Sequence, residues 1–465
     1  MQKNLVIVES PAKAKTIEKF LGKDYKVLSS YGHIRDLKKK HFGVDIKKDF
    51  EPNYEIPAEK KELVNELKEE AKNAEIVWLA SDEDREGEAI SWHLYEVLKL
   101  TPQKAKRIVF HEITKTAILN AIQNPRDINI DLVNAQQARR VLDRIVGFEL
   151  SPILWRKVKP SLSAGRVQSV TVRLVVERER EIQNFNAEAS YRIVGTFLVP
   201  DADGKLVEMK AELSKRLKTK EEARKFLQEC QNASFSIDDI NTRPLRKSPA
   251  APFTTSTLQQ EAVRKLGMTT DRTMRTAQQL YEGVDVGQGQ IGLITYMRTD
   301  AVVLSNDALT EIRYYIGEHF DADYLPKSPV SYKNKSKNAQ EAHEAIRPTS
   351  IFRTPESVKP FLTPEQFKLY TMIWKRTLAC QMAPAKFDTT AVDITVGDGV
   401  FRASGQVLTF PGFIAVYQED KDSDDAAAGD DDEARLPVLE VGDELPVDKL
   451  YGEQHFTQQP PRYSE

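Results

Sequence analysis

The sequence predicts a multidomain protein that combines an α/β part, helical parts and a β-rich part. At 465 residues the chain is too long for one hydrophobic core, so roughly three or four domains are expected. Buried-type strands alternate with helices up to about residue 125, and the pattern then becomes mostly helical. After residue 185, and again after Pro384, apolar and polar residues alternate as they do in antiparallel strands.

The first part of the chain is predicted to form a parallel α/β sheet. A buried-type strand reads "NLVIVES" and precedes a helix that has Pro11 in its first turn and Gly22 just after its end. A charged amphipathic helix leads into the strand "EIVWLA", and a third strand reads "RIVFHEI". Ligands gather at the carboxyl ends of parallel strands, so Glu9 and the segment "SDEDRE" would lie at the binding edge.

Composition and cysteine content are those of an ordinary globular protein, with 40% hydrophobic and 29% charged residues. No apolar run approaches the length of a membrane span, and the N-terminus lacks the layout of a signal peptide. Cys230 and Cys380 are too few for a disulfide framework or a four-cysteine zinc site. We therefore expect a soluble protein of the reducing cytoplasm, without a membrane partner.

The distribution of charge allows a nucleic-acid partner, although the net charge is −3. Between Arg139 and Arg180 ten basic residues face four acidic ones. From Gln418 onward the run "QEDKDSDDAAAGDDDEA" holds nine acids and one lysine, which predicts a solvated loop. Without this run the remaining chain is net basic.

The stretch "GLITYMRTD" at residues 292–300 suggests a reactive tyrosine. In an extended strand alternate side chains share a face, so Tyr296 and Arg298 would point the same way. The pair is either a packed aromatic residue with a surface partner, or a nucleophile with a guanidinium that stabilises its charge or its phosphorylated product.

Two groups of charged residues at strand ends suggest metal and phosphate chemistry. Asp82, Asp84 and Glu86 occupy every second position, so an extended segment would gather three carboxylates on one side. A divalent cation such as Mg²⁺ would offset the repulsion between them. Alternatively, they are acids that favour a helix N-terminus. Glu9 and Lys13 could serve as proton donor or acceptor and as phosphate anchor, or form a surface ion pair. No P-loop motif occurs, so ATP-driven work is not expected.

Nine segments of the chain, in order, resemble the bacterial type IA DNA topoisomerases, in particular the topoisomerase I (omega protein) branch. The segments are "LVIVESPAKAKTI", "GHIRDL", "SDEDREGEAI", "NAQQARRVLDRIVGFELSP", "LSAGRVQSV", "APFTTSTLQQ", "ITYMRTD", "EAHEAIRP" and "EQHFTQQPPRYSE". They span nearly the whole chain.

The resemblance implies a torus of four domains. The expected divisions are a Toprim α/β domain at 1–127, a helical single-strand-binding domain at 128–184, a β-rich arch at 185–248 and 384–450, a helical tyrosine-bearing domain at 249–383, and the start of a return pass through the helical domain at 451–465.

The resemblance also implies an activity and its residues. Tyr296 would attack a phosphodiester in single-stranded DNA and hold the 5′ end as a phosphotyrosine, so that negative supercoils relax without ATP. Glu9 would act as general acid/base and Lys13 would contact the phosphate, while Arg298 steadies the scissile phosphate and His343 supports them. The implied ligands of Mg²⁺ are Asp82, Asp84, Glu86 and Glu9.

The DNA-binding residues that the resemblance implies are His33, Arg107, Arg139, Asp143, Arg144, Phe148, Ser163, Arg166, Gln168 and Arg347. Phe148 stands where relatives often carry a tyrosine, so stacking on a base is kept and a hydroxyl contact is lost. The expected partners are single-stranded and negatively supercoiled DNA, bound by a monomer in the cytoplasm at the nucleoid, with no nucleotide triphosphate.

Two alternatives stay open at this stage. The chain stops at "PPRYSE", where the family continues, so a C-terminally truncated chain is expected, and it would then act only as a single-stranded DNA binder with little or no turnover. A Toprim nuclease or primase would share the acidic cluster, but it gives no reason for "ITYMRTD" or "EAHEAIRP".

Overall fold

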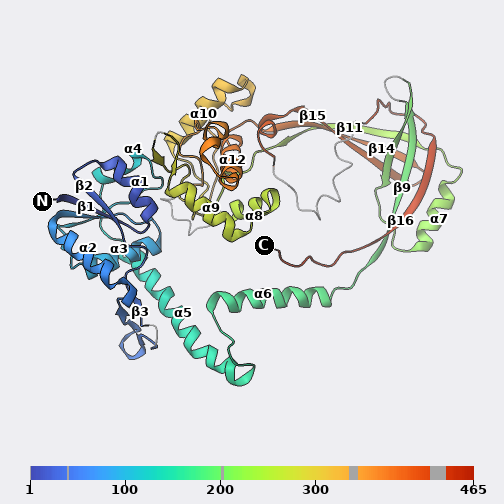
Figure 1. Cartoon of the computed structure of the whole chain (residues 1–465). Helices are drawn as coiled ribbons and strands as arrows, with labels where there is room; N and C mark the ends of the chain where they lie inside the picture. The colour runs from blue at the N-terminus through green and yellow to red at the C-terminus, as the bar shows by residue number, and fades with distance from the viewer. Residues whose placement is uncertain are drawn as a thin grey trace.

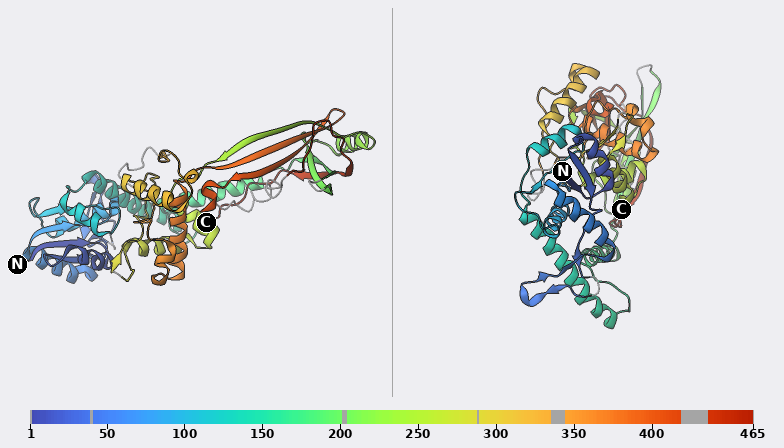
Figure 2. Two further views of the ribbon diagram at one scale, coloured as in Figure 1. Left: turned by 90° about the horizontal axis from the view of Figure 1, so that it is seen from above. Right: turned by 60° about the vertical axis from the view of Figure 1, so that its left-hand side comes forward.

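The computed structural model describes residues 2–38, 41–200, 204–287, 289–334, 344–418 and 436–464. Its elements follow one another around an open ring, with an α/β unit at one end and a large sheet at the other (Figure 1). Seen from above, the sheet extends away from the α/β unit and the helices lie between them (Figure 2). The predicted combination of α/β, helical and β-rich parts in a torus is confirmed.

The α/β unit is built on a parallel sheet of four strands in the order β2-β1-β7-β8. The strands are β1 (Gln2–Val8), β2 (Tyr25–Ser29), β7 (Ala74–Leu79) and β8 (Ala105–Arg107). The prediction of a third strand over "RIVFHEI", residues 107–113, is therefore wrong except at Arg107, because β8 ends where that segment begins. The chain leaves the sheet after Arg107, whose guanidinium donates to the carbonyl oxygens of Leu79 and Ser81.

Helices cover both faces of this sheet because β1 is apolar on both sides. Val6 and Val8 share a core with α1 (Pro11–Leu21) and α4 (Lys115–Gln123). Leu5 and Ile7, on the opposite face, pack against α2 (Lys61–Asn73) and α3 (Arg85–Val97). The first core continues into the helices around Tyr296, so these two parts of the molecule share one apolar interior.

Helix α1 begins and ends where its sequence predicts. The Ser10 side chain accepts a hydrogen bond from the Ala12 amide, Pro11 occupies the first helical position, and Gly22 follows the last turn with φ of 78°. These are the ordinary signals of a helix start and stop. Glu9 therefore lies at a fixed turn between β1 and α1.

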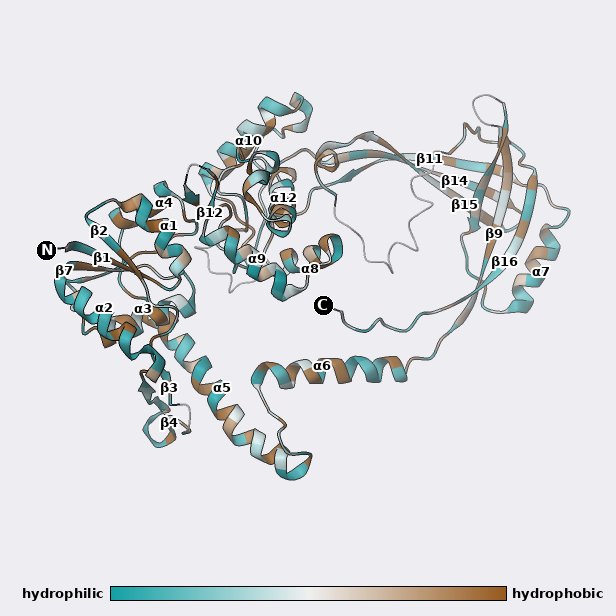
Figure 3. Cartoon of the chain, viewed as in Figure 1, coloured by the Kyte–Doolittle hydropathy of each residue, from teal (hydrophilic) through white to brown (hydrophobic). Residues whose placement is uncertain are grey.

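Two long helices leave the α/β unit. Helix α5 (Ile130–Lys157) packs against α3, and α6 (Arg166–Gln183) follows it along the lower side of the ring (Figure 1). No side chain of α6 is buried. Hydrophobic residues occur along α6 between hydrophilic ones (Figure 3).

The large sheet has six antiparallel strands in the order β11-β14-β15-β10-β9-β16. The strands are β9 (Ala189–Pro200), β10 (Leu206–Leu213), β11 (Ser236–Lys247), β14 (Ala385–Val396), β15 (Gly399–Phe410) and β16 (Val447–Phe456). Helix α7 (Lys220–Cys230) covers a core that contains Phe197, Phe235 and Phe401. The expected division at residue 450 falls inside β16, which pairs with β9 as far as Phe456.

The remaining helices surround the tyrosine segment. They are α8 (Thr255–Leu266), α9 (Thr270–Glu282), α10 (Asn306–His319), α11 (Pro355–Val358) and α12 (Pro364–Ala379). Threonine or serine side chains cap each of them at the N-terminus, as in the sequence signals for α8 and α9.

Short strand pairs and 3₁₀ turns lie between the larger elements. Three two-residue ladders pair β3 (Asp36–Leu37) with β6 (Tyr54–Glu55), β4 (Val44–Asp45) with β5 (Glu51–Pro52), and β12 (Val284–Asp285) with β13 (Gln290–Ile291). Single 3₁₀ turns lie at Ile46–Lys48, Ala58–Lys60, Ala322–Tyr324, Lys359–Phe361 and Gly412–Ala415. Among the described residues no helix is both long and apolar enough to cross a membrane.

Candidate active site

The segment that carries Tyr296 is irregular, and the prediction of a strand over residues 292–300 is wrong. Its backbone hydrogen bonds go to several separate parts of the chain. The Tyr296 amide donates to the His111 carbonyl at 2.7 Å, and the Thr295 amide donates to the Arg347 carbonyl at 2.9 Å. Tyr296 is 5% exposed, whereas Arg298 is exposed, although both side chains line the same cleft.

The acidic segment lies at the carboxyl end of β7 and opens α3, as predicted. Asp84 is the N-cap of α3, and its Oδ1 accepts a hydrogen bond from the Gly87 amide at 2.7 Å. Its other oxygen, Oδ2, accepts a hydrogen bond from the Tyr296 hydroxyl at 2.6 Å. One carboxylate thus fixes the start of the helix and holds the phenol.

A buried network joins Glu9 to Asp82. Lys13 is fully buried, and its ammonium donates to Glu9 Oε1 and to Asp82 Oδ1. Asp82 Oδ1 also accepts a hydrogen bond from the Tyr281 hydroxyl at 2.9 Å. The alternative that Glu9 and Lys13 form a surface ion pair is therefore excluded.

Burial and neighbouring charges shift the pKa values of these buried groups in different directions. Burial, with the nearby charge of Asp82, raises the pKa of Glu9 to about 8. Burial opposes ionisation of Asp82 as well, but the Lys13 ammonium outweighs it and lowers the pKa of Asp82. Burial also raises the pKa of Tyr296, and the Asp82 and Asp84 carboxylates add to the effect while Arg298 partly offsets it. Near neutral pH the phenol is protonated and Asp82 is ionised.

These side chains line a cleft of about 380 Å³. Its walls include Glu9, Asp82, Asp84, Tyr296 and Arg298. Glu86 lines this cleft and also a neighbouring cleft of about 420 Å³ that contains His33, Arg139 and Asp143.

Two side chains hold Glu86 between the two clefts. Its Oε2 accepts a hydrogen bond from Gln136 Nε2 at 3.1 Å and lies 3.4 Å from His33 Nε2. The hydrogen bond from His33 is the largest of the effects that lower the pKa of Glu86. His33 therefore contacts the acidic segment at Glu86.

The donor set fits a divalent cation, although the carboxylates do not converge on one point. Within the described ranges no group of three or more His, Cys, Asp or Glu side chains is close enough to hold a metal ion. Glu9 Oε2 is buried and accepts no hydrogen bond from the described residues, which leaves one hard oxygen at the cleft when Glu9 is ionised. Asp82 and Asp84 are each occupied by hydrogen bonds, so they would have to exchange a partner to bind a metal.

Most of the predicted DNA-binding residues lie together on α5, on α6 and on the link between them. The Arg166 guanidinium donates to Asp143 Oδ1 at 2.9 Å, and the Ser163 hydroxyl donates to Gln168 Oε1 at 3.3 Å. The Arg144 guanidinium lies 5.0 Å from the centre of the exposed Phe148 ring. A cation beside an exposed aromatic ring suits both a phosphate and a stacked base.

Two predicted DNA-binding residues are in the wrong environment for that role. Arg107 is 1% exposed, and besides strand-end carbonyls it binds the Asp82 carbonyl at 2.8 Å and Glu88 at 3.1 Å. Arg347 is 8% exposed and pairs with Glu344 at 2.6 Å and with Glu112 at 3.0 Å. The N–H groups of both guanidiniums therefore donate to partners inside the protein. His343, the predicted supporting residue, lies outside the described residues.

Sequence reasoning missed several residues of the site. Tyr281, Arg275 and Gln278 come from α9, and Gln136 comes from α5. In the sequence Tyr281 stands in "QQLYEG", an ordinary end of an amphipathic helix. Its proximity to Asp82, 199 positions earlier, depends on tertiary packing that no local pattern encodes.

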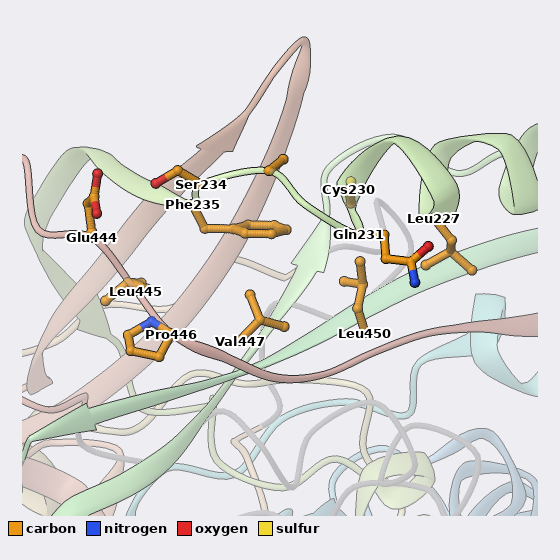
Figure 4. Close-up of a pocket in the computed structure, with 11 residues that line it drawn as sticks. Leu227, Cys230, Gln231, Ser234, Phe235, Glu444, Leu445, Pro446, Val447 and Leu450 are labelled. Carbon is orange, nitrogen blue, oxygen red and sulfur yellow. The ribbon is translucent and has the colours of Figure 1, made fainter.

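Another cavity, of about 690 Å³, lies in the large sheet and is separate from this site (Figure 4). It is lined by α7 and by residues 444–447, with Leu227, Phe235 and Leu450 among its walls. None of the predicted site residues lines it.

Comparison with known families decides which proteins share this arrangement. A family model described as DNA topoisomerase matches residues 127–465, and a Toprim domain model matches residues 4–113. The chain belongs to the bacterial type IA DNA topoisomerases. This confirms the resemblance to the topoisomerase I branch.

Individual relatives agree with this assignment. The chain is 50% identical over 479 residues to DNA topoisomerase 1 of Xylella fastidiosa, a match that covers 100% of this chain and 58% of that protein. It is 41% identical to full-length topoisomerase I from Thermotoga maritima, whose structure superposes with a TM-score of 0.84. That match covers 99% of this chain and 73% of the other. The chain thus spans 58% of the length of the curated relative.

Proposed function

We propose that this chain breaks and rejoins one DNA strand through Tyr296, and thereby relaxes negatively supercoiled DNA without a nucleotide triphosphate. The observation that carries the proposal is the 2.6 Å hydrogen bond from the Tyr296 hydroxyl to Asp84, in a cleft that also holds Glu9. A phenol is a poor nucleophile unless a base takes its proton, and Asp84 is that base.

The proposed cleavage step conserves atoms and charge. The Tyr296 oxygen forms a bond to the phosphorus of a phosphodiester, and the bond from phosphorus to the 3′ oxygen breaks. The phenolic proton goes to Asp84, and Glu9 gives a proton to the departing 3′ oxygen. The DNA 5′ end remains on Tyr296 as a phosphodiester, so attack by the 3′-hydroxyl reverses the step without an external source of energy.

Lys13 and Arg298 have different parts in this proposal. Lys13 is buried between Glu9 and Asp82, so it holds these two carboxyl groups in place. Arg298 is exposed on the wall of the cleft, where its guanidinium can pair with the phosphate that Tyr296 attacks.

We further propose that the site takes Mg²⁺. Asp82, Asp84 and Glu86 would hold it, together with Glu9 when its carboxyl group is ionised. When bound, the ion would neutralise charge on the phosphate. Added Mg²⁺ should raise the melting temperature of the unmodified chain in the absence of DNA, and less so in Glu9→Gln.

The proposed substrate is single-stranded DNA that enters along α5 and α6. Arg139, Arg144 and Phe148 would hold the strand, and Glu86 lies between the cleft that contains Arg139 and the cleft of Tyr296. Action on negatively supercoiled DNA, a monomeric state and a cytoplasmic location at the nucleoid remain predictions.

The experiment is to incubate the chain and Mg²⁺ with an oligonucleotide labelled at its 3′ end, then to separate products on a denaturing gel. A labelled covalent adduct is expected from the unmodified chain and none from Tyr296→Phe, while both bind the oligonucleotide equally. Tyr370→Phe is the matched control, because Tyr370 is also buried but donates to the Arg353 carbonyl away from the cleft. Binding without any adduct from the unmodified chain would reduce the function to that of a single-strand binder.

A further inference from the structure

The carboxyl-terminal end of α9 is fixed against the α/β unit. The Thr16 hydroxyl of α1 donates to the Glu282 carbonyl at 2.9 Å, and the Leu293 amide donates to the Leu280 carbonyl at 2.7 Å. Gly283 follows with φ of 126°, and a side chain there would meet Thr16 Oγ1 at 2.5 Å. The end of α9 therefore lies between α1 and the segment that leads to Tyr296.

Tyr281 occupies this fixed end and reaches the acidic network. Its side chain is fully buried, and its hydroxyl donates to Asp82 Oδ1 at 2.9 Å. The same oxygen accepts from the Lys13 ammonium. The hydroxyl of Tyr281 is therefore a link from the tyrosine-bearing helices to the carboxylate pair of the α/β unit.

The ring of Tyr281 lies between the same network and the nucleophile. Its centre is 4.9 Å from Lys13 Nζ and 5.2 Å from the centre of the Tyr296 ring, with the two rings tilted by 58°. The ring thus limits where the ammonium and the Tyr296 ring can lie, while the hydroxyl fixes the direction of Asp82.

We infer that Tyr281 is a positioning residue of the cleavage site, whose hydroxyl holds Asp82 and Lys13 in the arrangement that the Tyr296 reaction requires. This inference rests on the proposed function. Tyr281 does not touch the reacting atoms in the structure, so it acts through Asp82 and Lys13. A hydrogen bond to a buried charged group is directional, and its loss leaves Asp82 Oδ1 with the Lys13 ammonium but without the donor that fixes its direction from α9.

Two variants separate the hydroxyl from the ring. Tyr281→Phe removes only the hydrogen bond, and Tyr281→Leu removes the hydrogen bond and the aromatic ring. If the hydroxyl positions the network, Phe loses nearly as much activity as Leu. If the ring alone matters, Phe keeps the activity and Leu loses it. The control is Tyr370→Phe, which removes another buried tyrosine hydroxyl.

The measurement is the single-turnover rate of adduct formation as a function of oligonucleotide concentration. Tyr281→Phe should lower the rate at saturating DNA by about tenfold or more, with the half-saturating concentration unchanged. Tyr370→Phe should keep the unmodified rate. An unmodified rate in Tyr281→Phe would overturn the inference, even where Leu is inactive. Failure of the unmodified chain to form any adduct would overturn the proposed function and this inference with it.

Discussion

The phenolic oxygen of Tyr296 lies 2.6 Å from Oδ2 of Asp84, although the two residues are 212 positions apart in the chain. Asp84 uses its other oxygen to cap α3, so its direction is set by the helix rather than by the tyrosine. A carboxylate held in this way keeps the phenol in one orientation. Asp84 therefore has two roles, capping α3 and accepting the hydrogen bond of the phenol, and a single substitution can test each role separately.

Asp84→Asn should slow adduct formation by about 100-fold and leave the fold intact. The amide cannot take the phenolic proton, and general bases contribute about this much to a rate or more. Asparagine caps helices as well as aspartate does, so the free energy of unfolding should change by less than about 0.5 kcal/mol. Adduct formation and urea unfolding measure the two effects.

Asp131→Asn is the matched control for this experiment. Asp131 is exposed in the first turn of α5 and is not among the residues that line the cleft. Its substitution should change neither the adduct rate nor the unfolding curve by much. An unchanged rate in Asp84→Asn would remove Asp84 from the proposed chemistry.

The position of Glu9 beside the acidic segment at one edge of the sheet could be predicted because the topology is regular. Parallel neighbouring strands end at the same edge, and the signals for β1, α1 and α3 are strong and local. Each of these residues follows directly from a strand that the sequence marks clearly. Glu9 and the acidic segment therefore lie at the sheet edge where they were predicted.

The contacts of Tyr296, Tyr281 and Arg107 could not be predicted in the same way. Residues 292–300 have strand-like composition, but their backbone partners come from separate loops, so no regular ladder forms. Arg107 looks like any surface cation in the sequence, yet its donors satisfy the carbonyl groups at the ends of β7. These outcomes depend on which backbone groups lack partners after the domains pack.

Gly87→Ala should damage the site through the backbone of Asp82. A β-carbon at residue 87 would overlap the Asp82 carbonyl oxygen and lie 2.9 Å from its carbonyl carbon, so the loop before α3 must move. We expect a loss of about 1–3 kcal/mol in the free energy of unfolding, and a fall in the adduct rate. Thermal unfolding and the adduct assay provide the measurements.

Gly147→Ala provides the contrast within a helix. At this position in α5 the nearest neighbouring atom is the Ala164 carbonyl oxygen, 3.9 Å from the added carbon. Alanine should therefore stabilise the chain by up to about 1 kcal/mol. Equal effects of the two substitutions would contradict the steric explanation for Gly87.

Arg107 and Arg144 should behave in opposite ways when each is replaced by methionine. Arg107→Met removes donors to buried carbonyl groups and to Glu88, so it should cost about 3 kcal/mol of stability. It should leave the salt dependence of single-stranded DNA binding unchanged, because Arg107 is buried.

Arg144→Met should change DNA binding and hardly affect the fold. The residue lies beside the exposed Phe148 ring on α5, so its loss should alter the free energy of unfolding by at most about 0.5 kcal/mol. The slope of log affinity against log salt should become shallower by about 0.7, as expected for one lost phosphate contact on a single strand. A shallower slope in Arg107→Met instead would reverse our placement of the two residues.

His93 should make the fold sensitive to mild acid. It is buried on α3, and its Nδ1 accepts a hydrogen bond from Arg35 Nε, while the Tyr54 ring lies 4.7 Å from it and the His33 ring 5.9 Å. Burial lowers the pKa of His93 to about 3, with the Arg35 and His33 charges adding to the effect and Asp36 opposing it. The protonated form is therefore accommodated in the unfolded chain but not in the folded one.

The sign of the effect follows from this difference in proton binding. Between pH 6.5, the ordinary value for histidine, and pH 3 the unfolded chain binds more protons at this residue, so stability falls as the pH is lowered. The slope from one such group is at most about 1.4 kcal/mol per pH unit. His93→Asn keeps an acceptor for Arg35 and cannot titrate, so its free energy of unfolding should fall less steeply between pH 6.5 and pH 5. Urea unfolding at several pH values measures both slopes, and parallel profiles would show that His93 is not the acid-sensitive group.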